Sequence, residues 1–173
     1  MMVTMNKQNK SQAKNITLIG AVAALYILIG MIPPFNLRGG AVQIRLGEGF
    51  NNLAIFNKRY IIAQTVGVFI FNMFFGLGIL DAIIGGLQTL TMTWIIYVVT
   101  RKIKKLPLKF VASTLIVSIF MFWIAAELVI FFPKMADGGF WLTYGMLFIS
   151  ELASMVVGSI IIYAVSKTID LSK

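Results

Sequence analysis

The chain has 173 residues, of which 59% are hydrophobic and only 12% are charged. An ordinary soluble domain is about half apolar and about a quarter charged, so this composition excludes a typical water-soluble fold. Cysteine and histidine are both absent from the sequence, which excludes disulfide bonds, thiol nucleophiles, serine–histidine triads and zinc sites built from these residues. We therefore expect no enzyme, no metal site and no cofactor.

Long apolar runs indicate a protein that crosses a bilayer. The mean hydropathy is +0.90, and several runs approach the roughly 20 residues that a helix needs to cross a hydrocarbon core about 30 Å thick. At about 30 residues for each span with its connection, the chain allows five or six crossings and no separate soluble domain. We predict one integral membrane domain over residues 1–173, with a polar segment at 1–14.

The expected fold is an all-α membrane protein with six transmembrane helices, over residues 15–32, 45–56, 60–75, 81–100, 108–132 and 140–166. Pro33 and Pro34 end the first span and open an outer loop at 35–44. The second span, about 12 residues at a rise of 1.5 Å, reaches only about 18 Å, so it should be tilted, broken or shielded by its neighbours. Asp81 stands where an N-cap of the fourth span would lie.

Lysine and arginine are distributed unevenly along this path. The formal charge is +9, and twelve of the fifteen cations fall in four clusters, at 7–14, 58–59, 101–109 and 167–173. These clusters lie at alternate ends of the six spans, so the positive-inside rule predicts a multi-pass plasma-membrane protein with both termini in the cytoplasm. The basic stretches are short and bracketed by spans, so we do not expect a nucleic-acid partner.

Polar side chains within the spans are candidates for a binding site, because a charge in a bilayer costs at least a few kcal/mol. Five such side chains from four spans converge on the predicted outer half: Glu48, Asn72, Asp81, Gln88 and Glu127. Glu151 lies nearer the middle of its span. Arg45 precedes Glu48 by three residues.

Helical spacing places aromatic rings beside two of the acids. Trp123 and Glu127 are four residues apart, and Trp141, Tyr144 and Glu151 recur at helical intervals. Rings beside acceptors suit a planar, hydrogen-bonding or cationic small molecule. The candidate substrate-binding set is Arg45, Glu48, Asn72, Asp81, Gln88, Trp123, Glu127, Trp141, Tyr144 and Glu151. Other interpretations stay open: the rings could face lipid or the core, and the acids could be neutralised by Arg45, by one another's protons or by water, or could only join helices.

Small residues form two strips at helical spacing. Gly20 and Ala24 make one on the first span, and Ser150, Ser154 and Gly158 make another on the last. Such strips let a second helix approach closely, either inside the bundle or, for the first strip, from an external partner. The sequence has no G-x-x-x-x-G-K-[ST] phosphate loop, so the chain cannot hydrolyse ATP by that route.

Three segments carry a resemblance to a known family. They are QIRLGEGFNNL at 43–53, FNKRYI at 56–61 and DAIIGGLQTL at 81–90, and the chain resembles the QueT family of queuosine-precursor transporters over about residues 15–170. The resemblance implies a six-helix substrate-binding (S) component of an energy-coupling factor (ECF) transporter. It further implies capture of a 7-deazaguanine such as preQ1 or preQ0 at the outer face.

The same resemblance implies a set of partners. The first helix would dock through Gly20 and Ala24 onto a transmembrane coupling protein, which two cytoplasmic ATPases drive. Two other functions remain open from the residues alone. One is an S component for a different heterocyclic vitamin, because a few polar residues do not identify a molecule. The other is a membrane scaffold without transport.

Overall fold

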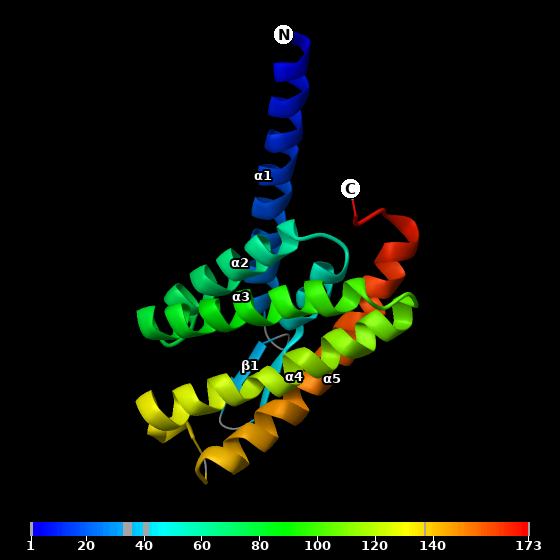
Figure 1. Cartoon of the computed structure of the whole chain (residues 1–173). Coiled ribbons are helices and arrows are strands. Elements are labelled where there is room, and N and C mark those ends of the chain that lie inside the picture. Colours follow the sequence, from blue (N-terminus) through cyan, green and yellow to red (C-terminus); the bar gives the residue numbers. More distant parts are fainter. Residues whose placement is uncertain (1, 33–35, 40–41, 137, 173) are drawn as a thin grey trace.

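The computed structural model describes residues 2–32, 36–39, 42–136 and 138–172. The elements, with η for a 3₁₀-helix, are α1 (Met2–Met31), β1 (Asn36–Gly39), β2 (Val42–Arg45), η1 (Leu46–Ile55), α2 (Arg59–Phe75), α3 (Ile79–Arg101), α4 (Leu106–Phe131), η2 (Pro133–Met135) and α5 (Phe140–Thr168). Figure 1 shows α2 beside α3 and α4 beside α5, with the two pairs joined by the short α3–α4 connection.

Four helical segments are long and apolar enough to cross a bilayer: Gln12–Met31, Ile79–Arg101, Leu106–Phe131 and Phe140–Thr168. They match the first, fourth, fifth and sixth predicted spans. The third predicted span is α2, which is apolar but has only 17 residues. The polar segment expected at 1–14 is largely helical, because α1 begins at Met2 and projects from the bundle (Figure 1).

The second predicted span differs most from its prediction. Instead of a regular transmembrane helix it is the 3₁₀-helix η1, preceded by the β1–β2 hairpin, in which Asn36 pairs with Arg45 and Gly39 with Val42. The hairpin lies in the loop expected at 35–44, so the fold is helical with one small sheet rather than all-α. At about 2.0 Å per residue, η1 spans only about 20 Å, and it contacts all five α-helices. The expectation of a short, shielded segment is confirmed.

Side chains of η1 explain why it departs from α-helical geometry. The Asn51 amide donates to Glu48 Oε2 (2.7 Å), and the Asn52 amide donates to the Gly49 carbonyl (3.1 Å). Such local bonds compete with the regular helical ladder. Gly47 and Gly49 lower the helix propensity further. The residues of η1 therefore stabilise the narrower 3₁₀ turn in place of a regular α-helix.

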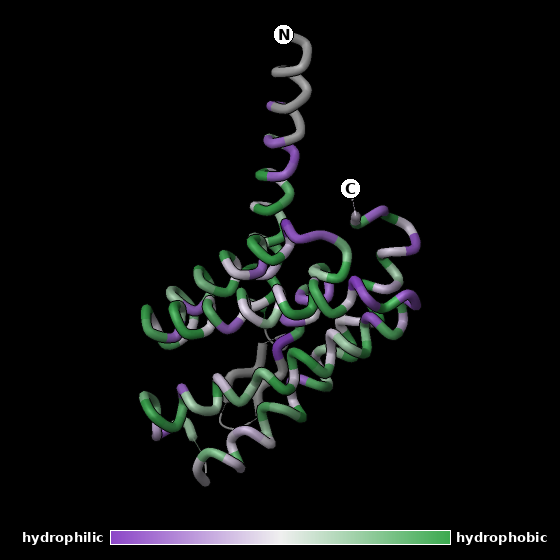
Figure 2. Tube along the Cα trace, viewed as in Figure 1, coloured by the Kyte–Doolittle hydropathy of each residue, from purple (hydrophilic) through white to green (hydrophobic). Residues whose placement is uncertain are grey.

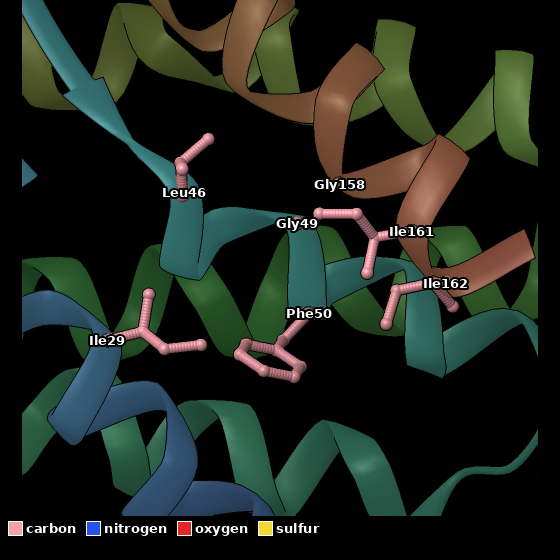
Figure 3. A pocket seen from close by; sticks show the side chains of 7 residues that line it. All are labelled: Ile29, Leu46, Gly49, Phe50, Gly158, Ile161 and Ile162. Atoms are coloured by element: carbon pink, nitrogen blue, oxygen red, sulfur yellow. The ribbon is translucent and has the colours of Figure 1, made fainter. Parts of the chain in front are cut away.

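The strip on α5 packs inside the molecule. Ser150, Ser154 and Gly158 are buried, and a Cβ added at Gly49 would lie 2.6 Å from the Gly158 Cα. Figure 3 shows Gly49 and Gly158 meeting at one side of an apolar groove that Ile29 and Phe50 also line. Internal packing is thus the role of this second strip. The two glycines let η1 approach the α5 backbone more closely than any side chain would allow.

The turn before α3 corrects the N-cap prediction. The helix begins at Ile79 after Gly78, which has φ of 95° and occupies the N-cap position. Asp81 lies inside the first turn, where its Oδ2 accepts a hydrogen bond from the Leu77 amide (2.8 Å). A carboxylate at this position can satisfy an amide that precedes the helix. Asp81 therefore closes the turn from within the helix rather than capping it.

Three of the basic segments meet at one end of the bundle. Arg59 at the start of α2 is buried, and its Nη1 donates to Asn15 Oδ1 of α1 (3.2 Å). The Tyr60 hydroxyl donates to the Leu171 carbonyl (3.1 Å), and the Asn57 amide donates to the Ser172 carbonyl (2.9 Å). The 57–60 turn, α1 and the C-terminal segment therefore lie on the same side of the molecule.

Candidate functional site

Arg45 sits at the end of β2, where the hairpin meets the bundle. Its backbone amide donates to Ser154 Oγ (3.1 Å), and that hydroxyl donates to the Ser150 carbonyl one turn earlier (3.0 Å). The α5 helix thus holds the end of the hairpin in place. The side chain of Arg45 lines a small cavity together with Asp81 and Glu127.

This cavity, which we call the polar cavity, brings together three predicted site residues from separate elements. Arg45 comes from β2, Asp81 from α3 and Glu127 from α4, and apolar side chains complete the wall: Leu77, Ile124, Leu128 and Met135. Asp81 and Glu127 are only 7% and 3% exposed. The free space is about 20 Å³, which holds about one water molecule. A larger ligand at this point would have to displace side chains.

Glu127 also borders a second, larger space between α3 and α4. Its lining is Ile84, Phe122, Trp123, Ala126, Glu127, Ile130 and Phe131, and its volume is about 230 Å³. That volume lies slightly below the range for small-molecule sites, which begins at about 300 Å³. The sequence prediction that Trp123 and Glu127 share a face is confirmed, since both line this groove. We call it the aromatic groove.

Glu48 lies in a different environment from Glu127. Its Oε1 accepts a hydrogen bond from the Tyr26 hydroxyl (2.9 Å), and its Oε2 accepts one from the Asn51 amide (2.7 Å). The side chain is 4% exposed and lines neither the polar cavity nor the aromatic groove. In this arrangement Glu48 joins η1 to α1. Its two oxygens already have internal donors.

Glu151 connects the two groups of acids through Arg45. The carboxylate is 2% exposed and interacts electrostatically with Glu48 and with Arg45. Its Oε1 has no hydrogen-bond partner among the residues described. Arg45 therefore lies between an acid pair on the η1 and α5 side and the polar cavity on the α3 and α4 side. A buried acceptor oxygen that lacks a hydrogen bond is available to a donor.

The two predicted amides hold helices together. The Asn72 amide donates to Asp81 Oδ1 (2.9 Å) and to the Asp81 carbonyl (3.2 Å), linking α2 to α3. The Gln88 amide donates to the Phe120 carbonyl (2.9 Å), linking α3 to α4. Asn72 thus orients a carboxylate of the polar cavity, and Gln88 fixes the helices that form the aromatic groove.

The aromatic residues of α5 lie apart from these cavities. Trp141 is 79% exposed, and Tyr144 stacks on Phe140 with ring planes 15° apart and donates to the Ile119 carbonyl (3.3 Å). Neither ring lines the polar cavity or the aromatic groove. Helical spacing placed Trp141, Tyr144 and Glu151 together, yet only Glu151 is buried near Arg45.

Sequence reasoning missed two residues that shape the site. Tyr26 binds Glu48 from α1, and its polar hydroxyl in the middle of an apolar span was the available signal. Met135 lines the polar cavity from η2, and nothing in the sequence distinguishes it from a surface methionine.

Comparison with known proteins then places the chain. The model of the family described as QueT transporter matches residues 16–167. The chain belongs to the QueT transporter family. A relative in Lactococcus lactis subsp. cremoris (strain MG1363), named Queuosine precursor transporter QueT, is 36% identical in an alignment 172 residues long, which covers 95% of this chain and 99% of the relative. No solved structure matches the chain. Family membership and the apolar helices together make this a membrane transporter.

Proposed function

We propose that this chain captures a queuosine precursor, a 7-deazaguanine such as preQ1 or preQ0, as the substrate-binding component of an ECF transporter. The name of the relative from Lactococcus lactis supports the substrate. The missing phosphate loop supports the division of labour, since ATP hydrolysis would then belong to partners. Those partners would be a transmembrane coupling protein and two cytoplasmic ATPases.

The observation that carries the proposal is the position of Glu127. This one carboxylate borders both the polar cavity, with Arg45 and Asp81, and the aromatic groove, with Trp123. A guanine-like edge presents N–H donors, which a carboxylate accepts well. A flat ring beside that carboxylate would stack on the indole of Trp123. The Glu127 carboxylate thus matches the N–H edge of a deazaguanine, and the Trp123 indole matches its flat ring.

The geometry suggests how the ligand would lie. The polar cavity holds only about one water, so the heterocycle would occupy the aromatic groove and point its donor edge toward Glu127. The ammonium of preQ1 would be favoured by nearby carboxylates, because an opposite charge in a low-dielectric setting is strongly attractive. The side chains of Arg45 and Glu151 would then change conformation around the donor edge of the bound heterocycle. We propose that Asn72 and Gln88 position this site, that Glu48 supports it through its bonds to Tyr26 and Asn51 without contacting the ligand, and that Trp141 and Tyr144 contribute from outside the two cavities.

A panel of ligands tests this function directly. We expect purified protein to gain thermal stability with preQ1 or preQ0 and none with unrelated vitamins, because a ligand that binds only the folded state raises the melting temperature. Stabilisation by another heterocyclic vitamin alone would indicate the same kind of transporter with a different cargo. No stabilisation by any member would favour a scaffold whose acids only join helices.

The proposed orientation places both termini in the cytoplasm. The segments α1, 57–60 and the C-terminal segment lie at one end of the molecule. They carry most of the basic clusters, which supports the proposed orientation because clustered cations face the cytoplasm. Cysteine probes are clean here because the sequence has no cysteine. In intact cells we expect an impermeant thiol reagent to label a cysteine at Lys134, in η2, and to label one at Lys104 only after permeabilisation. The reverse pattern would contradict this topology.

A further inference from the structure

A dense cluster of positive charge covers the end of the α4–α5 pair. It consists of Arg101, Lys102, Lys104, Lys105, Lys109 and Lys167, which we call the basic face. Five of these side chains are exposed and Lys109 is half-buried. They come from the end of α3, the connection, the start of α4 and the end of α5. Figure 2 shows the connection and the end of α5 as hydrophilic segments beside apolar helices.

The basic face has little negative charge near it. The sequence contains no aspartate or glutamate between Asp81 and Glu127, so all five cations of 101–109 lie in a purely basic stretch. On the α5 side the nearest acid in sequence is Asp170, whose Oδ1 accepts hydrogen bonds from the amide and hydroxyl of Ser172. Like charges this close repel one another. An anionic partner would relieve that repulsion.

Aromatic contacts fix the depth and the grouping of these cations. The Arg101 guanidinium lies 4.6 Å from the centre of the Tyr97 ring, and the Lys167 ammonium lies 4.8 Å from that of Tyr163. Tyrosine rings at the ends of apolar helices mark the headgroup level of a bilayer. Phe110 packs edge-on against Tyr163 at 5.9 Å, which brings the first turns of α4 beside the last turns of α5. The cations therefore lie at headgroup level.

The start of α4 adds to the positive field. The helix has Lys105 at its N-cap without a side-chain hydrogen bond to the first amides, and it has no acid in its first turn. Such an end carries a partial positive charge. We propose that the basic face binds the headgroups of anionic phospholipids, such as phosphatidylglycerol, in the leaflet that it faces. This inference does not depend on the substrate, because it requires only that the helices lie in a membrane.

Lipid titration of the full chain tests the proposal. In uncharged detergent, short-chain phosphatidylglycerol should raise the melting temperature, while phosphatidylcholine of the same chain length should not. Replacing Lys105, Lys109 and Lys167 together by glutamine should weaken the phosphatidylglycerol response at least about tenfold in lipid concentration, since each surface cation adds to the attraction for an anionic membrane. Native mass spectrometry would count the lipids retained.

A matched triple variant separates the basic face from overall charge. Glutamine at Lys14, Lys58 and Lys134 removes the same charge from exposed positions elsewhere and should keep the wild-type lipid response. Equal losses in both triple variants would overturn the proposal in favour of unspecific attraction. An equal effect of inorganic phosphate would also overturn it, because the face would then bind free anions. If phosphatidylglycerol does not raise the melting temperature of the wild type, the proposal is wrong, and the anionic partner would be an acidic protein surface instead.

Discussion

Replacing Glu127 by glutamine is expected to weaken binding of preQ1 or preQ0 by about 30- to 1000-fold, because ligand N–H donors that have left water would lose an acceptor at a cost of roughly 2 to 4 kcal/mol. Glutamine keeps the shape and one acceptor oxygen, so the protein should still fold and insert. Dissociation constants and melting temperatures without ligand would measure the two effects separately. Wild-type affinity in this variant would remove Glu127 from the site.

The same substitution at Glu48 is the matched control. The sequence gives Glu48 and Glu127 the same role, but the contacts separate them, since both oxygens of Glu48 accept internal hydrogen bonds from Tyr26 and Asn51. A glutamine there has a single acceptor oxygen for those two donors. We therefore expect Glu48→Gln to lower the melting temperature without ligand and to change affinity far less than Glu127→Gln. The opposite ranking would return Glu48 to the ligand.

The long helices were predictable from the hydrophobicity of each run and from the turn residues that end it. Predicted spans at 81–100, 108–132 and 140–166 differ from α3, α4 and α5 by at most two residues at each end. Runs of apolar residues bounded by basic or glycine-rich turns leave little choice in a bilayer, because each backbone amide must be satisfied within its own helix. The first span was also found, although its helix continues through the polar segment.

The hairpin and η1 could not be predicted in the same way. Residues 36–39 and 42–45 pair as strands, and η1 forms a 3₁₀-helix that depends on the side-chain amides of Asn51 and Asn52 and on the contact of Gly49 with Gly158. These features are decided by neighbours that are distant in sequence. An apolar window of about 12 residues reads as a short helix whichever neighbours it has.

The same limit explains the partial success with the site. Helical spacing shows which side chains share a face, as Trp123 and Glu127 do, but not which element that face meets. Trp141 shares a periodic row with Glu151, yet it lies ten residues nearer the start of α5 and is 79% exposed. The polar residues singled out in the spans are all buried, namely Glu48, Asn72, Asp81, Gln88, Glu127 and Glu151. Their division into cavity-lining acids and helix-joining amides depends on contacts between helices.

The first span presents the one predicted docking strip that has no internal partner among the residues described. Gly20 and Ala24 are exposed, and a Cβ added at Gly20 would meet nothing within 4 Å. On the other side of α1, Ala23 and Tyr26 are buried against the bundle. The strip is therefore open to a second helix, which small residues would allow to approach closely.

Leucine at Gly20 or Ala24 is expected to leave queuosine-precursor binding within about twofold of wild type and to reduce uptake by at least about tenfold, since the added side chain blocks a partner helix. Binding to purified protein and uptake into cells that express the partner module would measure the two effects. Gly145→Leu is the matched control, because that glycine on α5 also has nothing within 4 Å of an added Cβ, and it should transport normally. If both α1 variants transport as well as Gly145→Leu does, the strip is not the docking surface, and the proposed coupling protein would have to meet another face.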